Sequence, residues 1–531
     1  MSFVSFYFLI FIAVVIIVYY ITPKKVRWIV LLAASYIFYA LNDIRALFFI
    51  IATTCTVFYT GILLDKLHAE EKGVIAGIGA DFGKEERKRH KYLYIKKRRK
   101  AAAFALLLNF GILAVLKYST FFIESFNSLL PRLHGSAELP YVNLLLPLGI
   151  SFYTFQSLGY IIDVYRGKYP ADKHLGKFAL FVSFFPQIVQ GPISRHDQLA
   201  HQLARGNDFD YENFKYGIQL ILWGFFKKIV IANRAAILTG SVMNDSDSYQ
   251  GVEVGFALVL FTIQLYADFS GGMDIARGVS RCLGIDIVRN FERPYFAISI
   301  ADFWRRWHIT LGTWMRDYLM YPIALSKGFA KFNKWSRNHL GSYFGKQFPT
   351  AIAMVIVFFV VGVWHGAGWQ FIMFGFYNGV LIAIGVLLTE PLQKIRVRYP
   401  DLNLKRPTLR ILTSLGVFFL VVISRCFIHA NGLRHALALI YSSFSVFNLG
   451  ALSLDYFERT GLGYKGMLVL GIAILILFFI SIAQERGVNI RESFARRNIV
   501  LRWIVYYFII LYTLLFGVYG GEIADFIYQQ F

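Results

Sequence analysis

Uncharged apolar runs long enough to cross a bilayer recur from one end of this chain to the other. Residues 2–23 contain no charged side chain, and the run Ala351–Thr389 extends over 39 residues without Asp, Glu, Lys or Arg. A membrane-spanning helix needs about 20 such residues. No stretch is both long and polar enough for a separate soluble catalytic domain. We therefore predict an all-α polytopic membrane protein built as a single membrane domain, residues 1–531.

The apolar runs predict about 10–12 transmembrane helices together with interfacial and re-entrant helices. Residues 178–194 carry Pro186 and Gly191 and are expected to enter the membrane without crossing it. Lys227 and Lys228 interrupt residues 216–233, which predicts a helix that ends at a membrane interface. The other apolar runs are 26–41, 46–64, 101–116, 139–162, 254–267, 411–424, 467–484 and 503–521.

Basic residues predict the orientation of the chain. Cytoplasmic loops carry excess Lys and Arg, and Lys24, Lys25 and Arg27 directly follow the first run. The N-terminus is therefore expected to be extracytoplasmic, with a first helix that is retained. The segment 65–100 holds twelve Lys and Arg against six acids and is predicted to be a basic cytoplasmic loop. Because the net charge of +23 is scattered between apolar runs, we expect membrane lipid as the partner and no nucleic acid.

His365 lies inside the longest uncharged run, fourteen residues from its start. At 1.5 Å per residue this is about 21 Å along a helix, within the bilayer layer. Glycines at 362, 366 and 368 surround it and can break the helix so that backbone approaches a ligand. An ionisable residue at this depth indicates a functional site. A neutral core histidine bonded to a carbonyl is the alternative.

His308 lies in a segment with helical periodicity, residues 301–317. At about 100° per residue, Trp304, Trp307 and His308 share one face with other apolar residues, and charged residues gather on the opposite face. The pattern predicts an amphipathic helix that turns a histidine inward. On this pattern a structural core histidine and a functional one are equally supported.

Histidine suits acyl transfer because its pKa lies near the operating pH, so it can accept a proton from a hydroxyl and return it. The chain contains no Gly-x-Ser-x-Gly elbow, no Walker A motif and no His-x4-Asp pattern. The three cysteines, Cys55, Cys282 and Cys426, lie far apart and form neither a disulfide framework nor a metal cluster. We predict no metal site.

Five motifs together resemble the membrane-bound O-acyltransferase superfamily. They are Trp364-His365-Gly366, the segment 303–308 (FWRRWH), 146–153 (LPLGISFY), 186–193 (PQIVQGPI) and 266–271 (YADFSG). Their order resembles the bacterial polysaccharide branch, most closely its alginate O-acetylating type. Members of that type are similar to this chain in length and have extra C-terminal helices, as residues 400–531 are expected to form here.

The resemblance implies a central tunnel through the membrane, with the acyl donor arriving from the cytoplasm and the acceptor from outside. It implies His365 as the catalytic base and His308 as its assisting partner. Further substrate-binding candidates are Trp364, Trp304, Gln190, Tyr266, Asp268 and Asp274. For the last four a buried structural hydrogen bond is the alternative.

No tightly bound cofactor is implied; the substrate is an acyl thioester, either acetyl-CoA or an acylated carrier protein. The implied partners are an extracytoplasmic SGNH-type acetyltransferase or esterase and a polysaccharide acceptor. We therefore predict an O-acyltransferase in the bacterial cell membrane that moves an acetyl or other short acyl group for O-acylation of an extracellular polysaccharide such as alginate or cellulose. The alternatives are D-alanyl transfer to teichoic acid, peptidoglycan O-acetylation, and a non-enzymatic polysaccharide exporter or flippase.

Overall fold

Every regular element in the described part of the chain is a helix. The computed structural model describes residues 3–77, 84–130, 139–141, 144–245, 247–399, 406–520 and 526–527. Within these ranges the single β-type contact is an isolated bridge between Phe291 and Trp307. The predicted all-α fold is confirmed. Residues 78–83 of the predicted basic loop, and 400–405, 521–525 and 528–531 of the C-terminal part, lie outside the described residues.

The chain divides into two compact units, and two of the three boundaries fall within helices α9 (Tyr211–Phe225) and α11 (Val252–Cys282), whereas the third follows Val288. The first unit comprises residues 3–218 and 276–288, and the second comprises 219–275 and 289–531. The single-domain organisation expected from the sequence stays a prediction. The first unit also contains α1 (Phe6–Ile21), α2 (Arg27–Ala40), α3 (Leu47–Gly77), α4 (Lys84–Leu129), α5 (Ile150–Tyr165), α6 (Leu175–Ser183), α7 (Phe185–Ile188) and α8 (His196–Ala204).

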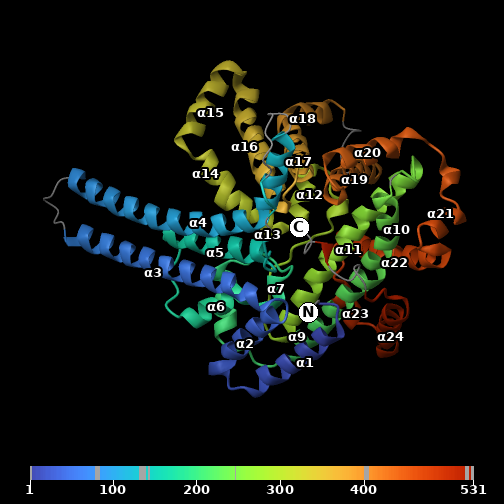
Figure 1. The fold of residues 1–531 in the computed structure, drawn as a ribbon, viewed down its shortest axis with the longest axis horizontal. Helices are drawn as coiled ribbons and strands as arrows, with labels where there is room; N and C mark the ends of the chain where they lie inside the picture. Colours follow the sequence, from blue (N-terminus) through green and yellow to red (C-terminus); the bar gives the residue numbers. More distant parts are fainter. Residues whose placement is uncertain are drawn as a thin grey trace. The chain divides into compact units, whose positions relative to one another are not determined.

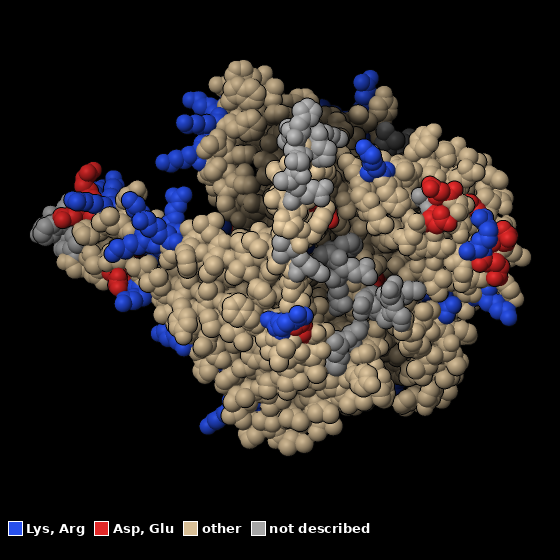
Figure 2. Space-filling view, in the orientation of Figure 1, with Lys and Arg blue, Asp and Glu red and all other residues tan. Residues whose placement is uncertain are grey.

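In the first unit, α3 and α4 lie side by side as a long hairpin (Figure 1). The segment predicted as a basic loop is therefore largely helical, because α3 continues to Gly77 and α4 starts at Lys84. An ion pair of 2.5 Å between Arg98 and Glu71 joins the two helices. Figure 2 shows Lys and Arg gathered over the far end of this hairpin.

The second unit carries both candidate histidines. It contains the π-helix η4 (Phe226–Ala232), α10 (Asn233–Asn244), η5 (Pro294–Phe296), α12 (Ile300–Arg306), α13 (Ile309–Met315), the π-helix η6 (Arg316–Met320), α14 (Tyr321–Ala324), α15 (Lys327–His339), α16 (Gly341–His365), α17 (Trp369–Leu387), α18 (Thr389–Arg398), α19 (Pro407–His429), α20 (Leu433–Ser445), α21 (Leu454–Arg459), α22 (Gly463–Glu485), α23 (Ile490–Ala495) and α24 (Ile499–Phe516).

Eight helices in the described ranges are long and apolar enough to cross a membrane. They are Ile44–Gly77, Lys84–Leu129, Val252–Cys282, Gly341–His365, Trp369–Leu387, Pro407–His429, Gly463–Glu485 and Ile499–Phe516. The expected number of crossings was higher because three apolar runs form shorter helices: α1 and α5 have 16 residues each and α2 has 14. The structure supports a multi-pass membrane protein.

Helices α16 and α17 form a tightly packed pair. A Cβ atom added at Gly362 of α16 would lie 2.4 Å from the carbonyl oxygen of Phe371 and 2.9 Å from the backbone of Gly375. Small residues allow helices in a membrane to approach this closely. The pairing fixes the end of α16, where His365 is located.

Candidate active site

His308 lies in a break between two helices. Helix α12 ends at Arg306, Trp307 is extended, and His308 has left-handed backbone angles of φ 49° and ψ 51° before α13 begins at Ile309. The prediction of one continuous helix over 301–317 is therefore wrong. The backbone instead pairs with the preceding segment, since Ile309 N donates to Asn290 O at 3.1 Å and Trp307 bridges Phe291.

Asn290 orients the imidazole of His308. The Asn290 Oδ1 atom accepts hydrogen bonds from Thr310 N at 2.9 Å and Thr310 Oγ1 at 3.0 Å. Because the backbone N–H of Thr310 can only donate, the Asn290 amide nitrogen must face His308 Nδ1, which lies 3.3 Å away. His308 is 1% exposed, and this burial lowers its pKa to about 3. His308 is therefore a neutral imidazole that accepts at Nδ1 and carries its proton at Nε2.

His365 is the last residue of α16 and is 3% exposed. Gly366 and Gly368 are extended, and a Cβ atom at Gly366 would lie 2.2 Å from the ring of Phe371. The expectation that glycines break the helix here is confirmed. The break separates α16 from α17 and turns the chain back at the candidate base.

The ring of Trp364 contacts both histidines. Its ring centroid is 5.7 Å from that of His308 and 4.9 Å from that of His365. The fold thus brings together two imidazoles that are 57 residues apart in the sequence. Trp364 is itself buried.

Other aromatic rings enclose the pair. The ring of Phe269 lies 5.0 Å from His308, and that of Phe374 lies 5.2 Å from His365. Trp304 contacts Phe374 at 6.0 Å, and its Nε1 donates to Asn378 Oδ1 at 3.1 Å. The two histidines and the aromatic rings packed around them are called the histidine cluster. Its rings are Trp364, Phe269, Phe374, Trp304, Trp307, Tyr266, Phe291, Phe303 and Tyr295.

Arg425 of α19 is fully buried against the histidine cluster. Its Cζ lies 4.2 Å from the ring centroid of Trp307, 5.3 Å from Phe303, 5.8 Å from Trp304 and 5.9 Å from Phe374. A guanidinium at this depth is costly to desolvate, and aromatic faces offset part of that cost. The cluster therefore contains a permanent positive charge beside the neutral imidazole of His308.

Two buried ion pairs connect η4 with α11. Lys227 Nζ lies 2.8 Å from Asp274 Oδ2 and 2.9 Å from Ser270 Oγ, and Lys228 Nζ lies 2.7 Å from Asp268 Oδ1. Both lysines are buried. The expectation that these lysines end a helix at a membrane interface is therefore wrong; the carboxylates of α11 compensate their charges inside the unit.

Gln190 belongs to the first unit and is fully buried. Neither of its two amide atoms has a hydrogen-bond partner among the residues that the structure describes. Gln190 directly follows α7, in the motif of residues 186–193. In the same motif, Gln187 Nε2 donates a hydrogen bond to Gln156 Oε1 at 2.8 Å. Its predicted role in binding substrate stays a prediction.

Comparison with known proteins identifies the family. Residues 170–400 match MBOAT, the membrane-bound O-acyltransferase family. A probable alginate O-acetylase of Pseudomonas aeruginosa is 31% identical over 88% of this chain and 78% of that protein. The chain belongs to the membrane-bound O-acyltransferase family.

Two further relatives of this O-acyltransferase bear on its function. A probable alginate O-acetylase of Azotobacter vinelandii is 33% identical over 69% of the chain, and the match spans 64% of that protein's length. A peptidoglycan O-acetyltransferase of Helicobacter pylori is 30% identical over 63% of both chains. The family predicted from the motifs is confirmed, and the enzyme class, an O-acyltransferase, is confirmed at the level of the family.

The predicted site residues of this O-acyltransferase fall into three places. Trp304, Trp364 and Tyr266 join the histidine cluster. Asp268 and Asp274 hold the lysines of η4, whereas Gln190 lies in the first unit. In the described residues no group of three His, Cys, Asp or Glu side chains is arranged to hold a metal ion.

Sequence reasoning missed three residues of the histidine cluster and its support: Asn290, Asn378 and Arg425. Only Arg425 had a usable signal, because it is a single charge at the end of the apolar run 411–424. Asn290 and Asn378 could not be found, since their importance depends on contacts with His308 and Trp304 across the fold.

Proposed function

We propose that this O-acyltransferase moves an acetyl or other short acyl group from a cytoplasmic thioester across the bacterial cell membrane, for O-acylation of an extracellular polysaccharide. The observation that carries the proposal is the pair of buried imidazoles that both contact the ring of Trp364. The alginate O-acetylases among the relatives support a polysaccharide such as alginate as the final acceptor.

The chemistry assigned to the two imidazoles differs. His365 accepts the proton of the attacking hydroxyl as the hydroxyl oxygen bonds to the thioester carbonyl carbon. The carbon–sulfur bond then breaks, and the protonated His365 returns the proton to the leaving thiolate. His308, whose proton is held at Nε2 by its contact with Asn290, donates a hydrogen bond to the carbonyl oxygen as negative charge develops there.

The donor is acetyl-CoA or an acylated carrier protein, and no tightly bound cofactor is needed. A tunnel brings the donor from the cytoplasm, and an extracytoplasmic SGNH-type partner receives the acyl group for the glycan. The N-terminus lies on the extracytoplasmic side, because Lys24, Lys25 and Arg27 favour the cytoplasm for the other end of the first helix.

The test uses the purified full chain in lipid nanodiscs. Acetyl-CoA and a loaded carrier protein are supplied in turn, each together with the SGNH-type partner and a polysaccharide acceptor, and thiol release and ester formation are measured. His365→Gln should lose all transfer, because an amide cannot accept and return a proton at neutral pH. His308→Gln should retain a small part of it, since the glutamine amide can still donate a hydrogen bond.

The outcome separates the rivals. A fully active, correctly inserted His365→Gln enzyme would refute the assignment. Transfer only from a carrier protein loaded with D-alanine would favour D-alanyl transfer to teichoic acid. If His365→Ala abolishes acylation in cells while the polymer still reaches the medium, the protein is not a polysaccharide exporter or flippase.

A further inference from the structure

His308 and Arg293 both have a strained backbone and lie at the two ends of one segment. Among the described residues, Arg293 and His308 are the non-glycine positions with positive φ, each at 49°. Between them the chain doubles back, because Glu292 N donates to Arg306 O at 2.9 Å and Phe291 bridges Trp307. A left-handed backbone at a residue with a side chain is unfavourable and persists only when its surroundings hold it. The surroundings of both residues therefore need an explanation.

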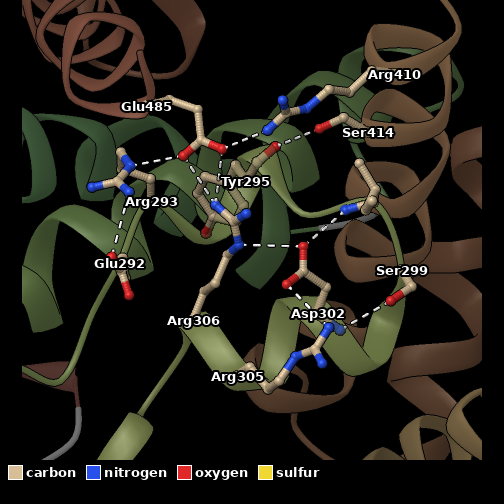
Figure 3. A network of polar contacts seen from close by, with 11 residues as sticks. Glu292, Arg293, Tyr295, Ser299, Asp302, Arg305, Arg306, Arg410, Ser414 and Glu485 are labelled. Atoms are coloured by element: carbon tan, nitrogen blue, oxygen red, sulfur yellow. Dashed lines mark hydrogen bonds and ion pairs between the residues drawn. The ribbon is translucent and has the colours of Figure 1, made fainter. Parts of the chain in front are cut away.

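Glu485, the last residue of α22, holds this segment through arginines (Figure 3). Its carboxylate accepts from Arg293 Nε at 2.8 Å, from Arg306 Nη1 at 3.0 Å and from Arg410 Nη2 at 2.8 Å. The three arginines come from the left-handed turn before η5, from the end of α12 and from α19. One carboxylate thus joins both halves of the doubled-back segment to the C-terminal helices.

The charge balance makes this carboxylate hard to replace. The Glu485 side chain is 14% exposed, and those of Arg293 and Arg306 are 23% and 19% exposed. Asp302 also contacts Arg306, at 3.2 Å. Without Glu485 three guanidinium groups would face one another with the central anion removed, and the loss of one member of a partly buried ion-pair network is far more costly than the loss of a surface pair.

We propose that Glu485 is a positioning residue for His308, an inference that rests on the proposed function. Glu485 holds Arg306, two residues before His308, and Arg293 on the facing side of the doubled-back segment. It thereby keeps the left-handed backbone that presents the imidazole to Trp364. The hydrogen bonds of Glu485 go to arginines and to neither histidine. Because α22 lies beyond residues 170–400, the inference makes the C-terminal helices part of the working site.

The experiment measures backbone hydrogen exchange and kinetics on the full chain in nanodiscs. In Glu485→Gln, the amides of Glu292 and Ile309, which bond across the doubled-back segment, should exchange about tenfold faster. Acyl transfer should show kcat lowered by roughly 10- to 100-fold with little change in KM, because the imidazole is misplaced while the substrate surfaces remain.

Two further variants keep the test decisive. Glu390→Gln removes a 2.8 Å pair with Lys394 on α18, where the Glu390 side chain is 40% exposed, and should behave as wild type. Glu485→Asp keeps the charge with a shorter reach and should give an intermediate result. If Glu485→Gln does not fold, the exchange and kinetics of Glu485→Asp decide whether Glu485 positions His308.

The inference is wrong if folded variants at Glu485 exchange and turn over as the wild type does. It is also wrong if KM alone changes. If the wild type itself transfers no acyl group from either donor, the proposed function fails. The exchange of Glu292 and Ile309 then still decides whether Glu485 holds the turn.

Discussion

The contact between α16 and α17 leaves no room for a side chain at Gly362, one helical turn before His365. We expect Gly362→Ala to push the two helices apart. The added Cβ would lie 2.4 Å from the Phe371 carbonyl oxygen, whereas an ordinary contact is at least 3.4 Å. The neighbours on both sides of the clash are backbone atoms, so no side chain can rotate away. The helices must therefore separate by about 1 Å at this point.

This displacement predicts two effects of different size. Overpacking costs about 1–3 kcal/mol, and replacing glycine inside a helix by alanine returns about 0.5–1 kcal/mol. The net loss of stability is therefore modest, about 0–2.5 kcal/mol. The effect on activity should be larger, because a shift of about 1 Å in a reacting group can lower the rate roughly 100-fold. His365 follows Gly362 in the same helix and must move with it.

The assay compares Gly362→Ala with Gly385→Ala, which lies on α17 and whose Cβ would meet nothing within 4 Å. Apparent melting temperature in detergent and acyl transfer in nanodiscs are measured for both. Gly385→Ala should match the wild type or be slightly more stable. Equal activity in Gly362→Ala and Gly385→Ala would show that the close helix contact does not position His365.

Three further changes test the buried polar contacts. Lys228→Met should lower stability by about 3–5 kcal/mol because it leaves the buried Asp268 without its 2.7 Å cation, and adding Asp268→Leu should recover most of the loss of melting temperature. Asn290→Leu should cost about 1–3 kcal/mol through the lost acceptor of Thr310 and should also lower kcat, measured by unfolding and by acyl transfer. Burial lowers the pKa of His308 from 6.5 to about 3, so below pH 6.5 the unfolded chain binds a proton that the folded protein does not. Stability should therefore fall as pH drops from 6.5 toward 3, and His308→Gln should make the melting temperature less sensitive to acid; an equally steep fall would contradict the assignment.

The apolar runs predicted the helices well where a single property decided the outcome. The uncharged residues 351–389 predicted membrane helices, and Gly366 predicted the break that ends α16. The periodicity of 301–317 failed because it reflects which side chains are buried and not how the backbone turns. The left-handed angle of His308 depends on pairing with residues 290–292, which no local pattern records.

The sequence named several polar candidates for the site but could not predict their contacts. Lys227 and Lys228 were interpreted as a membrane interface because their carboxylate partners lie 47 and 40 residues further along the chain. Asp268 was named as a candidate, but its ion pair could not be foreseen. Arg425 was passed over because it ends an apolar run, and a charge at that place is usually taken as the limit of a membrane helix.

The left-handed backbone at His308 also affects how mutation can remove the activity of this enzyme in a population of cells. Asparagine tolerates such a backbone better than most residues with a side chain, so a chain with asparagine at position 308 gives up its imidazole while relaxing a strained turn. Cellular quality control removes proteins that unfold. A chain with asparagine at position 308 stays folded and is therefore not removed. Copies with little activity would then accumulate in the membrane beside the active ones.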